Sequence, residues 1–405
     1  MAAIPETRHA TVAAIWQAWE ARREDDPDRA YLGASEIGHD CERWLWYRFR
    51  WAVAQSWSGR MLRLFDRGQL EEARVIADLR SIGCEVWERD ETGQQFRYTA
   101  LRGHFGGGLD GVVLGVPEAP KTAHLLEVKT HNAKSFADLV KRGVGAAKPA
   151  HFQQMQVYMR MADLDRALYV ACNKGTDDLY TERVERDRAC AEIVLSRASS
   201  IIEAIEPPPG ISDDATHWQC KGCFAHSVCH GTDAPRVNCR TCVHSAVENA
   251  GAWHCAWHKR PITTDEQRIG CTEHRYLPAL LSRWAEPIDA DATMNIVRYR
   301  NKLTGAEFTQ PEYMSDEIAA CADKALIGDA GVSEIKAEMG AQIVPEETIP
   351  AGYTLRWRDH ANGRHLGLYD EAGTWIRWVP QTPVMVALAT DWTGLTDDLP
   401  WEETA

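Results

Sequence analysis

The chain has 405 residues, of which 44% are hydrophobic, 9% aromatic and 26% charged, values that exclude both a lone small module and a globally disordered chain. At about 150 residues per domain, two or three domains are expected. Lys and Arg number 45 against 59 Asp and Glu, so a net charge of −14 gives no bulk attraction for nucleic acid, and any nucleic-acid site must be local.

The first part of the chain predicts helices that lead into a sheet. Apolar residues at helical spacing indicate a helix over 9–24, a second helix that begins at Ser35, and a third from about residue 61 to 81. Strand-like runs follow at residues 84–88, 96–101, 109–115 and 124–130. The glycines at 106–108 are interpreted as a turn, because no Gly-Lys-Ser/Thr follows that would make a phosphate-binding loop.

Helices and strands alternate further along the chain. Helices are predicted at 135–142, 152–161 and 188–205, and strands at 167–172 and 180–186. A run of three prolines and a glycine, residues 207–210, stops the last helix. This mixture predicts one α/β domain over residues 1–235.

The sequence changes character after residue 235. Cys, His and Trp dominate residues 236–280 and apolar periodicity is lost, which is typical of a small module held together by metal. Residues 281–405 predict an α+β region with a helix at 315–325 and a three-stranded meander at 353–358, 365–369 and 374–379. Its turns are expected at 362–363 and 370–373, and the acidic tail 391–405 is expected to be disordered.

The sequence carries no sign of a membrane or secreted protein. No stretch approaches about 18 consecutive apolar residues, and the first residues lack a basic start followed by an apolar run and a small-residue cleavage site. We therefore expect a cytoplasmic protein with no membrane partner.

Acidic residues on two predicted strands suggest a metal-binding centre. Asp110 stands at the end of one strand, and Glu127 and Lys129 share one face of the next, because side chains alternate along a strand. Two carboxylates suit a hard divalent cation such as Mg²⁺ or Mn²⁺. The ammonium group is able to orient the attacking water and to balance charge when a phosphodiester is attacked. By itself, a Glu-x-Lys triplet is also common on solvated strands.

Two further motifs lie on predicted helices. Gln154 and Tyr158 are four positions apart, so they share one helix face. In the helix at 61–81, Glu72 stands four residues after Gly68. Its neighbour Glu71 is the other candidate. For each of the two, the alternative is an acidic side chain on the solvated face of the helix, with no metal-binding role.

In their order along the chain, these motifs resemble those of the PD-(D/E)xK nuclease superfamily, and within it the RecB-like, phage-type exonucleases. The resemblance covers roughly residues 31–230. It implies a restriction-endonuclease-like mixed sheet flanked by helices. It also implies that Glu72, Asp110 and Glu127 bind Mg²⁺ or Mn²⁺, that Lys129 serves the attacking water, and that Gln154 and Tyr158 position the DNA strand.

The chain has twelve cysteines. In an intracellular protein, cysteines in such patterns are more often metal ligands than members of disulfide bonds. Cys220-x2-Cys223-x5-Cys229 closes the α/β domain, and Cys41 stands alone near its start. This pattern resembles the iron–sulfur nucleases of the AddB type and of CRISPR adaptation, in which four thiolates hold a [4Fe–4S] cluster and clamp the domain's ends together. Zinc remains the alternative, because histidines flank the trio at His217, His226 and His230.

The module at 236–280 supplies four more thiolates, those of Cys239, Cys242, Cys255 and Cys271. Its Cys-x2-Cys start is typical of zinc sites, although the second half does not match the usual ribbon spacing. We expect one structural Zn²⁺ on the four cysteines. A second iron–sulfur site, and His274 as a replacement ligand, are the alternatives.

Local clusters of basic residues are expected to bind DNA although the net charge of the chain is negative. Six arginines and four tryptophans lie between residues 43 and 67 with a single acid, and a second basic cluster spans 129–148. Basic charge among aromatic residues suits a phosphate backbone and unstacked bases, while a solvated helix face is the plain alternative for either run. The predicted DNA contacts are Arg43, Arg60, Arg63 and Lys134.

The sequence therefore predicts a metal-dependent DNA exonuclease acting on linear or single-stranded ends, in phage or prophage recombination or repair. A single-strand annealing or recombination protein is an expected partner. Two alternatives stay open: a non-catalytic DNA-binding recombination scaffold, and a structure-specific endonuclease of the same fold. Acyl transfer, zinc proteolysis and dinucleotide redox chemistry have no supporting motif.

Overall fold

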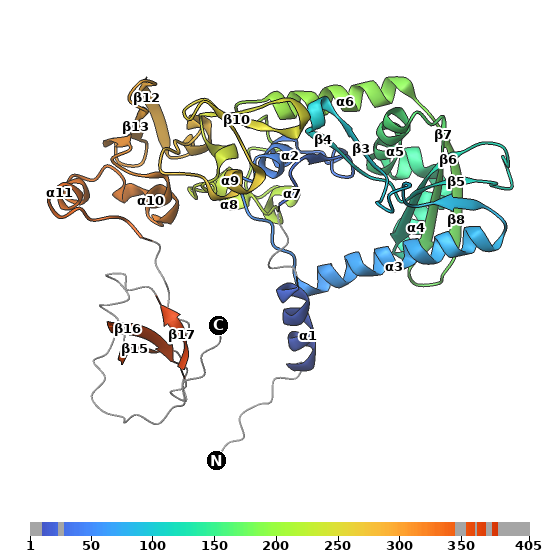
Figure 1. Ribbon diagram of the computed structural model, residues 1–405, viewed down its shortest axis with the longest axis horizontal. Helices are drawn as coiled ribbons and strands as arrows, with labels where there is room; N and C mark the ends of the chain where they lie inside the picture. The colour runs from blue at the N-terminus through green and yellow to red at the C-terminus, as the bar shows by residue number, and fades with distance from the viewer. Residues whose placement is uncertain (1–9, 23–27, 345–353, 361–362, 370–374, 380–405) are drawn as a thin grey trace, which may run out of the picture.

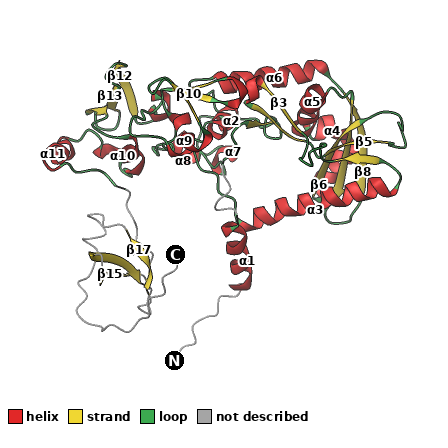
Figure 2. Ribbon diagram, in the orientation of Figure 1, coloured by secondary structure: helices red, strands yellow, loops and turns green. Residues whose placement is uncertain are grey.

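The computed structural model describes residues 10–22, 28–344, 354–360, 363–369 and 375–379 (Figure 1). It confirms the predicted α/β class, since the described residues form several sheets with helices packed around them (Figure 2). The helices of the first 235 residues are α1 Ala10–Ala21, α2 Glu42–Phe49, α3 Gly59–Ser81, α4 Ala133–Ala147, α5 Pro149–Ala162, α6 Arg188–Glu203, α7 Trp218–Lys221 and α8 His226–His230.

A five-stranded mixed sheet forms the centre of this region, with strand order β2-β5-β6-β7-β8. The strands β6 and β7 are parallel and the other neighbours antiparallel. Their bounds are β2 Glu85–Trp87, β5 Gly111–Leu114, β6 His124–His131, β7 Arg166–Asn173 and β8 Leu179–Glu185. A smaller sheet, β1-β4-β3, lies beside it, with β1 Leu32–Gly33, β3 Arg97–Ala100 and β4 Phe105–Gly108.

Helices cover the two faces of the five-stranded sheet. Val75 and Ile76 of α3 pack against Val128 of β6 and Val170 of β7 on one face. On the other face α4 and α5 pack over β6 and β7. Because β7 is buried from Ala167 to Asn173, its sequence is almost continuously apolar, as expected for a strand covered on both sides.

The parallel pairing of β6 and β7 explains where α4 and α5 lie. Two parallel strands need a long crossover connection, and these helices supply it between His131 and Arg166. α4 begins at Asn132, whose side chain accepts a hydrogen bond from Ser135 N, and α5 has a proline in its first turn. The crossover therefore lays α5 across the sheet face that carries Glu127 and Lys129.

Three sequence predictions are wrong in detail. The glycines at 106–108 are not a turn but belong to strand β4, which pairs with β1 and β3. The helix expected from Ser35 begins only at Glu42, because residues 34–38 form a turn and Cys41 caps the helix. The helix expected over 315–325 ends at Ala320. In each case pairing or packing with distant segments decided the local conformation, which a propensity pattern does not contain.

The remainder of the chain adds three small sheets. The first consists of β9 Ser245–Val247, β10 Trp253–Cys255 and β11 Arg260–Ile262. The second consists of β12 Ala285–Asp291, β13 Ile296–Asn301 and β14 Glu307–Gln310. The predicted meander is confirmed as β15 Thr354–His360, β16 Gly363–Tyr369 and β17 Trp375–Val379. Helices α9 Thr264–Ile269, α10 Ser315–Ala320 and α11 Ala330–Met339 complete the region. Residue 362, the turn at 370–373 and the tail 391–405 lie outside the described residues.

Buried arginines tie residues 236–280 to the N-terminal helices. Arg240 is fully buried, and it donates hydrogen bonds to Phe49 O, Ala30 O and Gln267 Oε1 at 2.8–2.9 Å. Its guanidinium also lies 3.6 Å from the ring centroid of Trp51. Side-chain contacts thus cross the predicted boundary at 235, while the boundary itself stays a prediction.

Among the described helices, none has the length and apolar character needed to cross a membrane.

Arg240→Ala is expected to lower the free energy of unfolding by about 3 kcal/mol, because it leaves two buried acceptors and one half-buried acceptor without their donor. Urea unfolding measures the change. Arg298→Ala, an exposed arginine on β13, is the matched control and is expected to change stability by less than about 0.5 kcal/mol. Equal stability of wild type and Arg240→Ala would contradict the tie.

Candidate active site

Glu127 and Lys129 lie side by side on β6 and form an ion pair. The Glu127 side chain is 1% exposed and that of Lys129 28%. Gln154 of α5 is buried above them, and its Nε2 donates to Glu127 Oε2 at 3.1 Å. The crossover helix thus fixes one oxygen of Glu127, and Lys129 holds the other.

Asp110 reaches the same place from the connection between β4 and β5. The antiparallel register pairs Gly111 with Leu126, so the preceding residue lies opposite Glu127. Asp110 Oδ2 accepts a hydrogen bond from Val128 N at 2.8 Å. The predicted pairing of the two carboxylates is therefore present, although Asp110 precedes its strand rather than ending one.

The structure separates Glu72 from Glu71. Glu72 of α3 is half-buried, and its electrostatic neighbours include Asp110, Lys129 and Glu127. Glu71 instead lies 3.6 Å from Arg74 and next to the buried thiol of Cys172. Of the two candidates, Glu72 is the one that belongs to the carboxylate group.

Tyr158 is buried behind the carboxylates. A Cβ atom at Gly107 would lie 2.3 Å from the Tyr158 hydroxyl, so the glycine of β4 makes room for it. Burial, and then Glu127 and Asp110, raise the pKa of the phenol. With 2% and 6% exposure, Tyr158 and Gln154 support the centre from behind instead of presenting themselves to solvent.

Crowded negative charge defines the electrostatics of the centre. Burial, and then Asp110, raise the pKa of Glu72 to about 7. Burial also raises the pKa of Glu127, against the lowering effect of Lys129. Burial alone would lower the pKa of Lys129, but Glu127 and Asp110 outweigh it and raise the pKa. Three carboxylates that resist joint ionisation are an oxygen donor set that fits a hard divalent cation.

Sequence reasoning missed a histidine–tyrosine network beside the centre. The Tyr169 hydroxyl lies 2.9 Å from His131 Nε2 and 2.8 Å from His151 Nδ1. Burial and nearby lysines lower the pKa of His131 to about 4 and that of His151 to about 3, so both are neutral at pH 7. The available signal was spacing: His131 continues the Glu127 and Lys129 face of β6, and His151 is three residues before Gln154.

The predicted DNA contacts fall in different places. Arg60 and Arg63 are exposed on α3, and Lys134 is exposed on α4. The Arg63 guanidinium lies 5.9 Å from the ring of Trp19. Arg43 turns inward, with Nε donating to Pro208 O at 2.8 Å and Nη1 donating to Cys229 Sγ at 3.4 Å. Arg43, on α2, therefore lies beside the cysteines, whereas Arg60 and Arg63 lie on the exposed face of α3.

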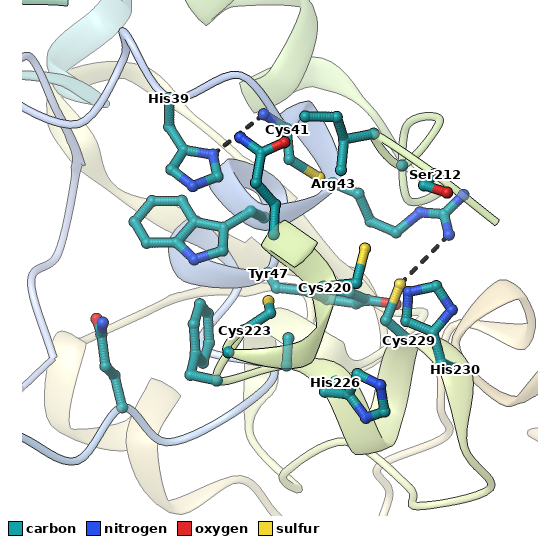
Figure 3. Close-up of a pocket in the computed structure, with 18 of the residues that line it drawn as sticks. His39, Cys41, Arg43, Tyr47, Ser212, Cys220, Cys223, His226, Cys229 and His230 are labelled. Atoms are coloured by element: carbon teal, nitrogen blue, oxygen red, sulfur yellow. Dashed lines mark hydrogen bonds between the residues drawn. The ribbon is translucent and has the colours of Figure 1, made fainter. Parts of the chain in front are cut away.

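The first four predicted cysteine ligands come together. Cys41 precedes α2, Cys220 lies in α7, Cys223 follows it, and Cys229 lies in α8, and all four line one pocket of about 480 Å³ (Figure 3). Burial, and then Cys229 and Cys41, raise the pKa of Cys220. Thiols that oppose one another's ionisation suit a cationic centre that would accept their charge.

Histidines and one arginine complete this pocket. His39, His226 and His230 line it, whereas His217 does not. His39 Nδ1 accepts from Cys41 N at 3.1 Å, and Arg43 spans the pocket to Cys229 (Figure 3). The zinc alternative thus keeps His226 and His230 as candidate ligands and loses His217.

The second cysteine set also gathers, around a pocket of about 170 Å³ lined by Cys239, Cys242, Cys255 and Cys271. His274 borders it, but His274 Nε2 lies 3.1 Å from Thr241 Oγ1 and His274 Nδ1 lies 2.7 Å from Ser315 Oγ. Because both ring nitrogens have hydroxyl partners, His274 is a poor replacement ligand.

None of the twelve cysteines forms a disulfide bond. Across the described residues, no three His, Cys, Asp or Glu side chains are close enough to share a metal ion.

Comparison with known proteins gives partial structural likenesses. No protein-family model and no curated protein matches the sequence. LHK-Exo, an alkaline exonuclease from Laribacter hongkongensis, matches 46% of this chain and 90% of its own at 19% identity and a TM-score of 0.30. Its complex with dAMP gives 20% identity and 0.33 over the same shares. A phage-related exonuclease from Haemophilus somnus 129PT matches 33% of this chain and 66% of its own at 19% identity and 0.23.

Glu72→Gln is expected to weaken Mn²⁺ binding, measured by calorimetry or by electron paramagnetic resonance, whereas Glu71→Gln is expected to leave it unchanged. Since protons compete for Glu72 below about pH 7, wild-type affinity is expected to rise with pH through 7, by about tenfold per unit for each proton displaced. Equal losses in the two variants would contradict the assignment of Glu72.

Proposed function

We propose that the protein is a metal-dependent deoxyribonuclease that hydrolyses phosphodiester bonds at DNA ends. The observation that carries the proposal is the convergence of Glu72, Asp110, Glu127 and Lys129 from α3, the β4–β5 connection and β6, with Gln154 holding Glu127 from behind. Three carboxylates and one ammonium group at one place suit phosphodiester hydrolysis better than any other chemistry the chain offers.

Each residue has a part in the reaction. Glu72, Asp110 and Glu127 would hold Mg²⁺ or Mn²⁺, which when bound would polarise the phosphoryl oxygen and lower the pKa of a bound water. Lys129, kept charged by Glu127, orients the attacking water and offsets the charge that develops on the phosphate. Gln154 fixes the Glu127 carboxylate, and Tyr158 fills the space against Gly107.

The electrostatics favour an enzyme over a non-catalytic scaffold. Burial and mutual repulsion raise the pKa of Glu72 and Glu127, so keeping them together destabilises the fold unless a cation is bound. DNA binding alone does not require a group of buried carboxylates that destabilises the fold. Strongly shifted acids next to a charged partner are typical of catalytic centres.

We propose metal centres for the two cysteine sets as well. Cys41, Cys220, Cys223 and Cys229 would hold a [4Fe–4S] cluster, with zinc as the alternative, and so join the segment before α2 to α7 and α8. Cys239, Cys242, Cys255 and Cys271 would hold one structural Zn²⁺. Both sets consist of thiols alone, which suits these metals and not Mg²⁺.

We propose that the nuclease acts in the cytoplasm of a bacterial or phage-infected cell. Processing of DNA ends is a step that recombination and repair require, so phage or prophage recombination is the proposed setting. A single-strand annealing or recombination protein is the proposed partner, since it would receive the strand that end digestion leaves.

Lys129→Ala is expected to slow cleavage of end-labelled linear DNA by at least about a hundredfold in Mg²⁺ or Mn²⁺, because the attacking water loses its charged partner. Lys121→Ala, an exposed lysine between β5 and β6, is the matched control and is expected to cleave normally. Circular dichroism checks that both variants are folded.

Covalently closed circles distinguish the kinds of nuclease in the same assay. An exonuclease degrades the linear DNA and spares the circles, so cleavage of circles would favour the endonuclease alternative. Robust cleavage by Lys129→Ala, or none by wild type with either metal, would overturn the proposed chemistry.

Anaerobically purified wild type is expected to contain iron and sulfide, about four of each per chain. Cys41→Ser is expected to lose both and to melt at a lower temperature, because Cys41 is the one thiol of the four that comes from the N-terminal segment. Cys190→Ser, on α6 and outside both pockets, is the control and should keep the iron. Zinc without iron in wild type would contradict the cluster.

A further inference from the structure

A large cavity, whose lining includes none of the candidate catalytic residues, takes no part in the chemistry above. Its volume is about 1740 Å³. It is bordered by α1, α3, the segment 28–36, β3 and two arginines of the cysteine-rich region, Arg236 and Arg268. Segments far apart in the sequence therefore build one cavity.

Positive charge exceeds negative charge in the lining, with five arginines against three acidic side chains. Arg236 pairs with Asp28 at 2.6 Å, and Arg268 with Asp265 at 2.7 Å. Arg97 has no carboxylate partner in the described part of the chain, and its Nη1 donates to the Tyr31 hydroxyl at 3.1 Å. Its charge is available to a phosphate.

Aromatic rings face the same space. The centroid of the Tyr31 ring lies 5.5 Å from the Arg29 guanidinium and 5.8 Å from the Arg97 guanidinium. Trp57 and Phe65 form an edge-to-face pair at 5.0 Å, and they are 39% and 37% exposed. Exposed rings among arginines can stack on unpaired bases, whereas bases inside a duplex are already stacked on one another.

Strand pairing connects this cavity to the catalytic carboxylates. Tyr31 precedes β1, and Arg97 begins β3, and both strands pair with β4. Gly107 of β4 contacts Tyr158, which lies behind Glu127 and Asp110. Tyr31 and Arg29 also belong to the electrostatic surroundings of Tyr158. The cavity and the carboxylate centre thus share one wall.

We propose that this cavity binds a single DNA strand and leads it to the carboxylate centre. Tyr31 stacks on an unpaired base, Arg97 contacts the backbone phosphate, and Arg236 and Arg268 form another wall. The role as a feed for cleavage rests on the proposed nuclease function, but the binding of the strand does not.

The test is fluorescence anisotropy with a labelled single strand and the matched blunt duplex, on a Lys129→Ala background that keeps the DNA intact. Tyr31→Ala is expected to weaken single-strand binding by about 5-fold to 150-fold, the range for loss of one stacked base, and to leave duplex binding within about twofold. Arg97→Ala is expected to reduce the slope of log affinity against log salt by about 0.7.

Two control variants separate stacking from folding and from bulk charge. Tyr31→Phe keeps the ring and is expected to bind within about threefold of the parent. Arg298→Ala removes an equal charge on β13 and is expected to leave both affinity and salt slope unchanged. A general loss of folding would lower binding in Tyr31→Phe and Tyr31→Ala alike.

The outcomes separate the cavity from the catalytic proposal. Unchanged single-strand binding in Tyr31→Ala and Arg97→Ala, or a parent that prefers duplex, would overturn the strand site even if wild type cleaves DNA. Loss of binding in both variants while wild type fails to cleave would support the strand site and overturn the nuclease instead.

Discussion

The parallel pairing of β6 with β7 is the constraint on which the candidate site depends. Parallel neighbours cannot be joined by a tight turn, so the chain must cross over one face of the sheet, and α4 and α5 make that crossing. The face they cover is the one to which Glu127 and Lys129 point. Gln154, Tyr158 and His151 therefore reach the centre as members of one connection, and the same pairing sets Tyr169 opposite Glu127.

The centre also concentrates charge that the fold does not neutralise. Glu127 is buried next to Asp110 and Glu72, and the single ammonium group of Lys129 balances only part of it. Around this charge the fold places neutral groups: the His131–Tyr169–His151 network and the amide of Gln154. The proposed divalent cation would supply the remaining counter-charge.

Residues 30–49 contact three separate regions of the protein. Cys41 closes the first cysteine pocket, Phe49 and Ala30 accept hydrogen bonds from Arg240 of the cysteine-rich region, and Tyr31 borders the cavity beside the carboxylates. A change in this segment would therefore reach the cysteines, the fold and the proposed DNA path together. The cysteine-rich region in turn supplies Arg236 and Arg268, so it contributes to a surface as well as to stability.

The sequence by itself determined the α/β class, all five strands of the central sheet and the C-terminal meander, because local periodicity records which face a side chain takes. The candidate set Asp110, Glu127, Lys129, Gln154 and Tyr158, with Glu72 or Glu71, came from motif spacing and from the resemblance to a known family, and its catalytic role stays a prediction. The tertiary structure alone decided the rest. It made the glycines of 106–108 a strand, chose Glu72 over Glu71, turned Arg43 toward Cys229, satisfied both nitrogens of His274, and brought Tyr31 next to Arg97. Each of these depends on partners tens to hundreds of residues away, or on which side of a helix meets the sheet, and no local pattern encodes such contacts.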